Sequence, residues 1–250
     1  MEFEYSEGDS LLMDRTVLNI TNINAGGMAA ESLSDFLKDL RESSSGAHGQ
    51  MIISTRLDTN KKTEIDLLQK VGFRFMELSL HPELTGLQSR AVPSSDVEIV
   101  TGTRINLGEL AKMAESSFRI SRFHRDPLIP KGFADRRFGN WVRDAAKSDQ
   151  KAVLQIQDPA GAILGFFVTR RDDSTASYWE LTALNPEYQG QSLGKSVWNA
   201  VLNHEKQLGV DTLRTTISAE NLKVVGMYPR LGFKFSGSSA VLHYSSNFNP

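Results

Sequence analysis

The stretch that decides the fold is Asn-Pro-Glu-Tyr-Gln-Gly-Gln-Ser-Leu-Gly-Lys, at residues 185–195. It follows an apolar segment at 178–184, typical of a buried strand, and precedes an amphipathic segment at 193–207, typical of a helix. The first turn of a helix leaves backbone N–H groups unpaired and carries the positive end of the helix dipole. A strand that leads through small residues into such a helix forms an anion site suited to a diphosphate. Gly190 and Gly194 let the backbone approach a ligand closely, and Lys195 adds a positive charge.

Two other phosphate-binding loops do not fit this stretch. A Walker A loop ends in Gly-Lys-Ser or Gly-Lys-Thr, which residues 194–196 supply, but its first glycine would fall at Gln189. The dinucleotide fingerprint G-x-G-x-x-G fails because Gly190 and Gly194 have the wrong spacing. A capped loop without a ligand remains the alternative to a phosphate site.

Strand-like and helical patterns alternate along the chain, which predicts an α/β (α+β) fold with a mixed central sheet flanked by helices. The strands expected in the C-terminal part are 97–101, 152–157, 163–170, 178–184 and 212–218, with two more near Phe233 and Val241. The helices expected there are 107–118, 134–146, 193–207 and 222–231, and 119–131 is expected to be a polar connector. The N-terminal part is expected to hold helices at 29–40 and 63–70 and strands at 51–54 and 74–80.

The segment 90–96 is expected to separate a domain at 1–95 from a domain at 96–250, because Pro, Ser and Asp interrupt both periodic patterns. Val71-Gly72-Phe73 mirrors Leu231-Gly232-Phe233, and each triplet follows a strand, an Asn and a short helix. This repetition predicts two related halves, of which the first is truncated and lacks a phosphate loop. The alternative is that both triplets only reflect a common way of ending a helix.

Composition excludes several classes of function. The 250 residues carry 28 Lys+Arg against 30 Asp+Glu, and a general nucleic-acid binder would show a basic excess. The chain has no cysteine, which removes disulfides, thiolate metal sites and cysteine nucleophiles; we expect no metal site. No run reaches the about 18 apolar residues of a membrane helix, and the acidic N-terminus does not look like a signal peptide. We expect a cytoplasmic protein that contacts neither nucleic acid nor membrane.

The loop resembles that of the GNAT superfamily of N-acetyltransferases, whose pattern is Q/R-x-x-G-x-G/A. Gln189 and Gly194 match its ends, whereas Ser192 stands where the family usually has Gly. Leu184-Asn185-Pro186 is similar to the family's V-x-P lead-in. The resemblance implies a GNAT fold, acetyl-CoA as the cofactor, and a splayed strand that pairs with pantetheine. The implied cofactor-binding residues are Leu181, Ala183, Leu184, Gln189, Gly190, Gln191, Ser192, Leu193, Gly194, Lys195, Asn221 and Tyr228.

Residues 221–233 resemble the closing signature of the same family, N-x(6)-Y-x-x-x-G-F. By that resemblance Asn221 contacts the CoA arm and Tyr228 lies beside the thioester sulfur, where a phenol can protonate the leaving thiolate. Glu180 is the candidate base, directly or through water, and the backbone N–H of Leu184 is the candidate group that polarises the carbonyl. A helix cap for Asn221, a packed core tyrosine for Tyr228 and a salt-bridged strand carboxylate for Glu180 are the alternatives.

The acceptor is expected to meet the segment 118–127, through Arg119, Arg122, Phe123 and His124. Arginines around an aromatic ring suit a phosphorylated ligand, and a solvated connector is the alternative. Together with 133–142, this segment resembles the dTDP-fucosamine (dTDP-4-amino-4,6-dideoxygalactose) acetyltransferase branch, which implies a nucleotide-linked amino-dideoxy sugar as the substrate. Another small-molecule amine, a protein N-terminus, and a CoA-binding module without turnover stay open, as does a homodimer.

Overall fold

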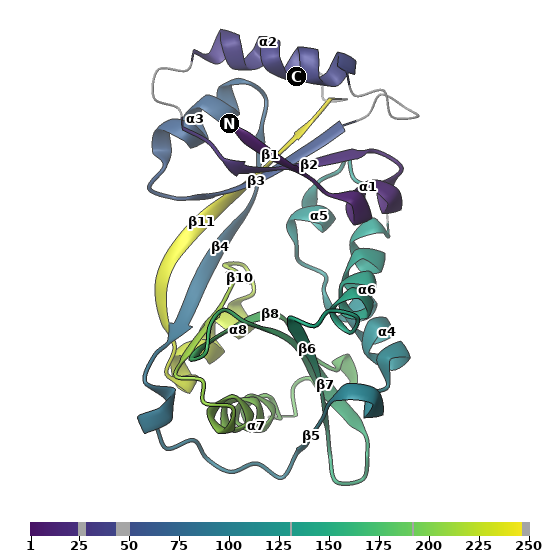
Figure 1. Cartoon of the computed structure of the whole chain (residues 1–250), viewed down its shortest axis with the longest axis vertical. Coiled ribbons are helices and arrows are strands. Elements are labelled where there is room, and N and C mark those ends of the chain that lie inside the picture. The colour runs from purple at the N-terminus through teal and green to yellow at the C-terminus, as the bar shows by residue number, and fades with distance from the viewer. Residues whose placement is uncertain (25–28, 44–50, 131, 192, 247–250) are drawn as a thin grey trace. The chain divides into compact units, whose positions relative to one another are not determined.

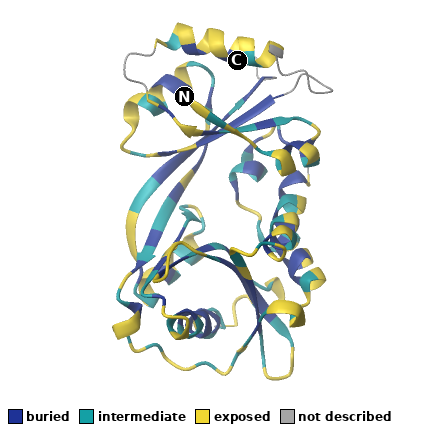
Figure 2. Cartoon of the chain, in the orientation of Figure 1, coloured by how far each residue is buried: buried dark blue, intermediate teal, exposed yellow. Residues whose placement is uncertain are grey.

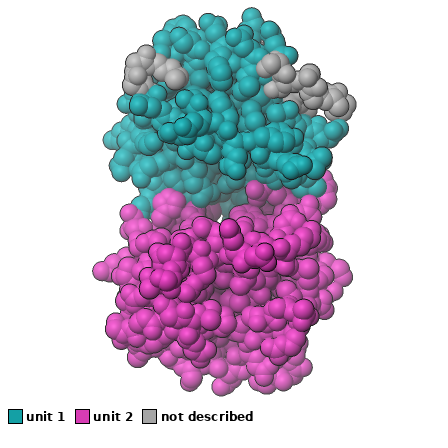
Figure 3. Space-filling view, in the orientation of Figure 1, with its two compact units in different colours: residues 1–79, 120–133, 237–250 teal, residues 80–119, 134–236 magenta. Residues whose placement is uncertain are grey.

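The computed structural model describes residues 1–24, 29–43, 51–130, 132–191 and 193–246. The chain forms two compact units, coloured separately in Figure 3. Unit 1 comprises residues 1–79, 120–133 and 237–250, and unit 2 comprises residues 80–119 and 134–236. In the described residues, no helix is both long and apolar enough to cross a membrane.

Unit 2 is built on a mixed sheet with helices on both faces, as the sequence predicted (Figure 1). The sheet order is β4-β9-β8-β7-β6-β5; β8 and β9 are parallel, and the pairs β4–β9, β5–β6, β6–β7 and β7–β8 are antiparallel. In Figure 2 the buried residues of this unit, in dark blue, are found in the strands of its sheet and in α7. Its elements are β5 (Glu98–Val100), α4 (Leu107–Ser117), α6 (Phe133–Ala145), β6 (Lys151–Gln157), β7 (Ile163–Arg171), β8 (Ala176–Leu184), α7 (Gly194–Gln207), β9 (Thr212–Thr215), β10 (Ile217–Ser218) and α8 (Leu222–Met227).

In unit 1 the strands follow the order β1-β2-β3-β11. β2 and β3 are parallel and are joined through α2, while β11 lies antiparallel to β3. The unit has its own apolar core, which includes Leu37, Ile53 and Leu68. Its elements are β1 (Glu2–Tyr5), α1 (Glu7–Met13), β2 (Thr16–Asn22), α2 (Ala30–Ser43), β3 (Met51–Asp58), α3 (Lys62–Lys70) and α5 (Arg122–Arg125).

Two long strands divide their length between the units. β4 (Arg74–Leu84) begins in unit 1 and its last residues pair with β9 in unit 2, and β11 (Lys234–Ser245) begins in unit 2 and its end pairs with β3 in unit 1. The expectation of separate strands near Phe233 and Val241 was therefore wrong, because one strand runs through this region. Packing thus divides the chain differently from the expected boundary near residue 95, and that boundary stays a prediction.

The repeated triplets occupy matching helix ends. The N–H of Phe73 donates to the carbonyl of Leu68 at 3.0 Å, and the N–H of Phe233 donates to the carbonyl of Tyr228 at 3.1 Å. The glycine before each phenylalanine has a positive φ, +96° at Gly72 and +91° at Gly232, as this type of helix end requires. The elements before each triplet also correspond. The parallel strands β2 and β3, joined through α2, precede the first triplet, and the parallel strands β8 and β9, joined through α7, precede the second. Common ancestry of the two units stays a prediction.

Candidate functional site

The strands β8 and β9 of unit 2 part halfway along β8. Their parallel pairing runs from Ala176 with Thr212 to Trp179 with Thr215 and ends there, although β8 continues to Leu184. On its other edge, β8 stays paired with β7 up to Leu184. Residues 180–184 therefore present an edge of backbone groups that β9 does not pair.

A β-bulge lies where the strands part. Val168 of β7 pairs with Leu181 and Thr169 pairs with Trp179, which leaves Glu180 as an extra residue in β8. An extra residue reverses the side-chain alternation of a strand. Trp179 accordingly packs in the core beside α7, whereas Leu181 packs in the separate core beside α4 and α6.

The bulge decides which backbone groups face the gap. The N–H of Asn185 donates to the carbonyl of Leu164 in β7 at 2.8 Å. Because hydrogen-bonded pairs alternate along antiparallel strands, the N–H groups of Ala183 and Leu181 also point to β7. The N–H groups of Thr182 and Leu184 point to the opposite side, into the gap left by β9. Leu181 and Ala183 were expected to bind the cofactor. Their side chains instead pack in the core beside α4 and α6, and their backbone hydrogen bonds go to β7.

Residues 185–190, directly after β8, form a compact turn ahead of α7. Gly190 has φ = +84°, a conformation that side chains other than glycine rarely adopt, and the amide of Gln189 donates to the carbonyl of Leu184 at 3.2 Å. The helix α7 begins at Gly194 with Leu193 at its N-cap, no capping side chain and no acidic residue in its first turn. Among the described residues, no side chain caps these first N–H groups, which leaves them available to an anion. Ser192, expected in this site, lies outside the described residues.

Tyr228 and Asn221 lie at the two ends of α8. The side chain of Asn221 accepts from the N–H of Val224 at 3.4 Å, which makes it the N-cap. The Tyr228 side chain is fully buried, and its hydroxyl forms no hydrogen bond of ordinary geometry within the described chain. Burial raises its pKa, while Trp198, Thr182 and Thr215 act in the opposite direction. Since Thr182 belongs to β8 and Thr215 ends β9, the phenol lies where these strands part.

Sequence reasoning missed three neighbours of this phenol, Thr182, Trp198 and Thr215. The indole N–H of Trp198 is also buried without a partner in the described chain, so two unsatisfied polar atoms meet at the base of the gap. An unsatisfied buried donor costs stability, and such groups call for a functional explanation. No local pattern indicates Thr182, because its position depends on the bulge.

The Glu180 carboxylate already has three donors. One oxygen accepts from Lys151 Nζ at 2.7 Å and Trp141 Nε1 at 3.1 Å, and the other accepts from Arg170 Nε at 3.1 Å. The carboxylate is only 10% exposed. These contacts fix the bulge residue against α6, β6 and β7. That Glu180 is also the base stays a prediction.

The expected acceptor residues fall in different units. In unit 1, Arg122 lies over the ring of Phe123 with 4.5 Å between its guanidinium carbon and the ring centroid, and His124 Nδ1 lies 2.8 Å from Ser121 Oγ. The Phe123 side chain is only 5% exposed and its ring packs against Phe133 and His243. In unit 2, Arg119 pairs with Asp135 at 3.1 Å. The part expected to be a connector contains the helix α5, capped by Ser121.

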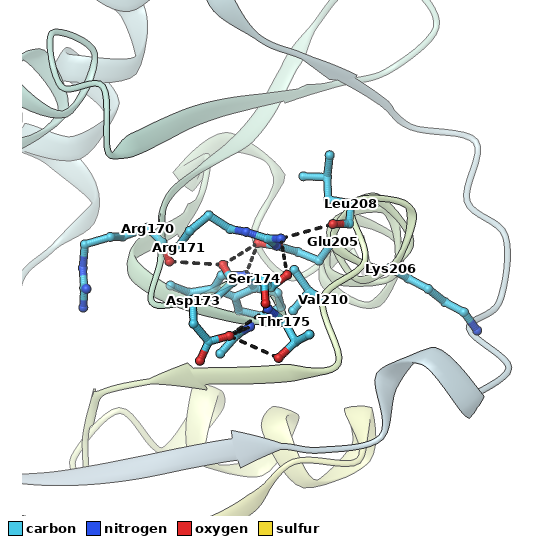
Figure 4. Close-up of polar contacts among 12 residues, drawn as sticks. Arg170, Arg171, Asp173, Ser174, Thr175, Glu205, Lys206, Leu208 and Val210 are labelled. Carbon is cyan, nitrogen blue, oxygen red and sulfur yellow. Dashed lines mark hydrogen bonds and ion pairs between the residues drawn. The ribbon is translucent and has the colours of Figure 1, made fainter.

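The far end of α7 is anchored through a buried carboxylate (Figure 4). Glu205 accepts from Ser177 Oγ at 3.1 Å and from Trp179 Nε1 at 3.0 Å, both on β8 before the bulge. Burial raises the pKa of Glu205. Arg171, in the same figure, donates to the carbonyls of Ser174 at 2.9 Å and Leu208 at 3.2 Å. These bonds fix α7 along β8 and so position its N-terminus.

Comparison with known proteins identifies the family of this region. Residues 110–233 match the model of the acetyltransferase (GNAT) family. This part of the chain belongs to the GNAT family. The parted strands, the loop and Tyr228 fall within residues 110–233, and the GNAT family uses acetyl-CoA.

Relatives of the GNAT domain include a mycothiol acetyltransferase of Propionibacterium freudenreichii, 31% identical over 88 residues, which are 34% of this chain and 28% of that protein. The spore coat polysaccharide biosynthesis protein SpsD of Bacillus subtilis is 22% identical over 54% of this chain and 46% of its own length. The chain thus matches less than half of each relative. A tandem GNAT protein from the clavulanic acid pathway shares the fold, with a TM-score of 0.58, 15% identity and coverage of 94% of this chain and 76% of its own.

Replacing Glu205 with Gln should change how stability depends on pH. The folded-state pKa of Glu205 lies above the ordinary 4.5. At pH values between these two pKa values, the folded protein holds a proton that the unfolded chain releases. The free energy of unfolding contributed by this group therefore falls as pH rises from about 4.5 through the folded-state pKa. Urea denaturation across that range should show the variant gaining stability relative to the wild type as pH rises. The exposed Glu187→Gln is the control, and parallel curves for Glu205→Gln and wild type would contradict the prediction.

Proposed function

We propose that this protein transfers the acetyl group of acetyl-CoA to a primary amine of a small molecule. The observation that carries the proposal is the open edge of β8 at residues 180–184. At one end of this edge the Gln189 side chain donates to the Leu184 carbonyl, and α7 begins five residues later at Gly194. The other end reaches the buried phenol of Tyr228 beside Thr182. The proposed anion site at the start of α7, the open edge of β8 and the phenol of Tyr228 therefore form one continuous path for a ligand.

The residues present fit acetyl-CoA by their chemistry. The turn at Gly190 and the first N–H groups of α7 would hold the diphosphate. The amide-rich pantetheine arm needs backbone donors and acceptors, which the open edge at Thr182 and Leu184 supplies. The orphaned hydroxyl of Tyr228 and indole N–H of Trp198 mark where a further polar or sulfur-bearing group would complete the site.

Acetyl-CoA supplies an activated acetyl group as a thioester. In the net reaction a C–N bond forms, the C–S bond breaks, the amine loses a proton and the thiol gains one. The Leu184 N–H can donate to the developing charge on the acetyl oxygen. Tyr228 keeps its proton at neutral pH because burial raises its pKa, so it can protonate the departing sulfur. Solvent or Glu180 receives the proton of the amine.

For the acceptor we infer a nucleotide-linked amino sugar. SpsD, one of the relatives, is a spore coat polysaccharide biosynthesis protein, which favours a sugar. The sequence Ser-Arg-Phe-His at 121–124, in which an arginine adjoins an aromatic residue, favours a ligand that carries phosphate. Turnover of the wild type, measured side by side with a nucleotide-linked 4-amino sugar and with the free amino sugar, tests this acceptor. Faster turnover of the free sugar would contradict the nucleotide-sugar acceptor and leave acetyl transfer intact.

Replacing Gly190 with Val should abolish cofactor binding. The left-handed backbone at Gly190 disfavours a β-branched residue, so the turn that forms the anion site is lost. Acetyl-CoA at 100 times its Kd should add about 2.7 kcal/mol to the stability of the wild type, and almost nothing to that of the variant. Gly209→Val is the matched control, because Gly209 also has a positive φ (+81°) but lies at the other end of α7. Thermal shift and calorimetry measure both, and an unaltered Kd in Gly190→Val would refute this assignment.

Replacing Tyr228 with Phe should lower kcat about 10²- to 10⁴-fold, the usual range for general acid catalysis. The Kd of acetyl-CoA should stay unchanged, because the phenol acts mainly in the transition state. Stability should not fall, since the lost hydroxyl has no ordinary hydrogen bond among the described residues. Tyr244→Phe, in unit 1, serves as the control for loss of a phenol. Full activity of Tyr228→Phe would assign this residue to packing alone.

A further inference from the structure

A cavity of ≈310 Å³ lies in unit 2 along one face of α7. Lys195, Asn199 and Leu202 line it from the helix, at the spacing of one helical face. The segment 84–93 closes it from one side and residues 230–231 from another. None of these residues has a catalytic part in the reaction proposed above.

The charges in this cavity are all of one sign. Arg90, Lys195 and Arg230 line it, and none of the described residues that line it carries a carboxylate. Within the described parts of the chain, none of the three has an acidic partner within ion-pair distance. Three uncompensated cations around one cavity repel one another and attract a multivalent anion.

The cavity is held together by fixed contacts of its backbone. Lys206, labelled in Figure 4, donates to the carbonyl of Arg90, and Asn203 Nδ2 donates to the carbonyl of Pro93 at 3.0 Å. Gln88 Nε2 donates to the carbonyls of Lys206 at 2.9 Å and Val210 at 2.7 Å. The segment 88–93 is therefore fastened along α7. The Arg90 guanidinium is positioned by its own bond to the Thr85 carbonyl at 3.3 Å and by contact with Gly232.

The cavity adjoins the start of α7, where the diphosphate of the cofactor is proposed to bind. Lys195 directly follows Gly194, the first residue of α7, and Asn199 lies one turn further along the helix. A ligand with its diphosphate at the start of α7 can therefore extend a further anionic group into the cavity. Arg90 lies outside the segment 110–233 that matches the GNAT family, so this cation is contributed by the segment that precedes it.

We propose that Arg90, Lys195 and Arg230 form a binding site for a phosphomonoester. A phosphomonoester carries nearly two negative charges at pH 7 and three acceptor oxygens, which suits three cations. Acetyl-CoA bears one such group on its ribose in addition to its diphosphate, and this assignment rests on the proposed function. Free phosphate or another phosphorylated ligand has the same chemistry and is the other source.

The test compares acetyl-CoA with acetyl-3′-dephospho-CoA by calorimetry. The wild type should bind acetyl-CoA at least about 10-fold more tightly, as expected for charge-assisted hydrogen bonds. Arg90→Ala and Arg230→Ala should each reduce this ratio to about 3-fold or less, and their Kd for the dephosphorylated cofactor should match that of the wild type. That unchanged Kd also shows that each variant is folded. Arg104→Ala, which removes an exposed charge of unit 2 outside the cavity lining, should keep the full ratio.

A second arm titrates inorganic phosphate and follows the melting temperature. If the wild type binds both cofactors equally but phosphate stabilises it, and this effect is lost in the Arg90→Ala, Arg230→Ala double variant, the site stands with a source other than the cofactor. If neither cofactor binds while phosphate still acts through these arginines, the proposed function fails and the phosphomonoester site stands. No preference between cofactors together with no response to phosphate would overturn the site, as would an equal loss in Arg104→Ala.

Discussion

The interruption of pairing between β8 and β9 is the constraint on which the candidate site depends. It begins where Glu180 enters β8 as a bulge, and its three donors, Lys151, Arg170 and Trp141, keep that residue in place. One extra residue turns Thr182 and Leu184 toward the gap and brings Thr182 near Tyr228. At the other end of the same edge the Leu184 carbonyl accepts from Gln189, in the loop that precedes α7. Without the bulge, the edge would present different side chains and different backbone groups.

Unit 1 shows what the same connectivity does without these features. Its parallel strands β2 and β3 stay paired from Thr16 with Met51 to Ile20 with Thr55, over most of β2. The position that corresponds to Tyr228 is Leu68, which is fully buried in an apolar core. An order of strands and helices is therefore not enough for the proposed chemistry. The bulge, the open edge and the phenol are the features that set unit 2 apart.

The sequence predicted those parts of the fold that depend on local pattern. Residues 185–195 and the signature from Asn221 to Gly232 lie in the predicted strand–loop–helix context, and the α/β class with a mixed sheet was confirmed. Thr182 could not be predicted, because counting alternate residues along β8 assumes that no bulge intervenes. The partners of Glu180 come from 10 to 39 residues away and leave no local signal. Residues 234–245 look like two short strands around Gly237, and pairing with β3 makes them one.

Hydrogen exchange at single backbone amides, followed by NMR, tests the open edge of β8 most directly. In the free protein, the amides of Thr182 and Leu184 should exchange faster than those of Ala183 and Asn185, which β7 already binds. Saturating acetyl-CoA should slow exchange at Thr182 and Leu184 and leave their two neighbours nearly unchanged. Slow exchange at all four amides in the free protein, or binding of acetyl-CoA with no added protection at Thr182 and Leu184, would contradict the account.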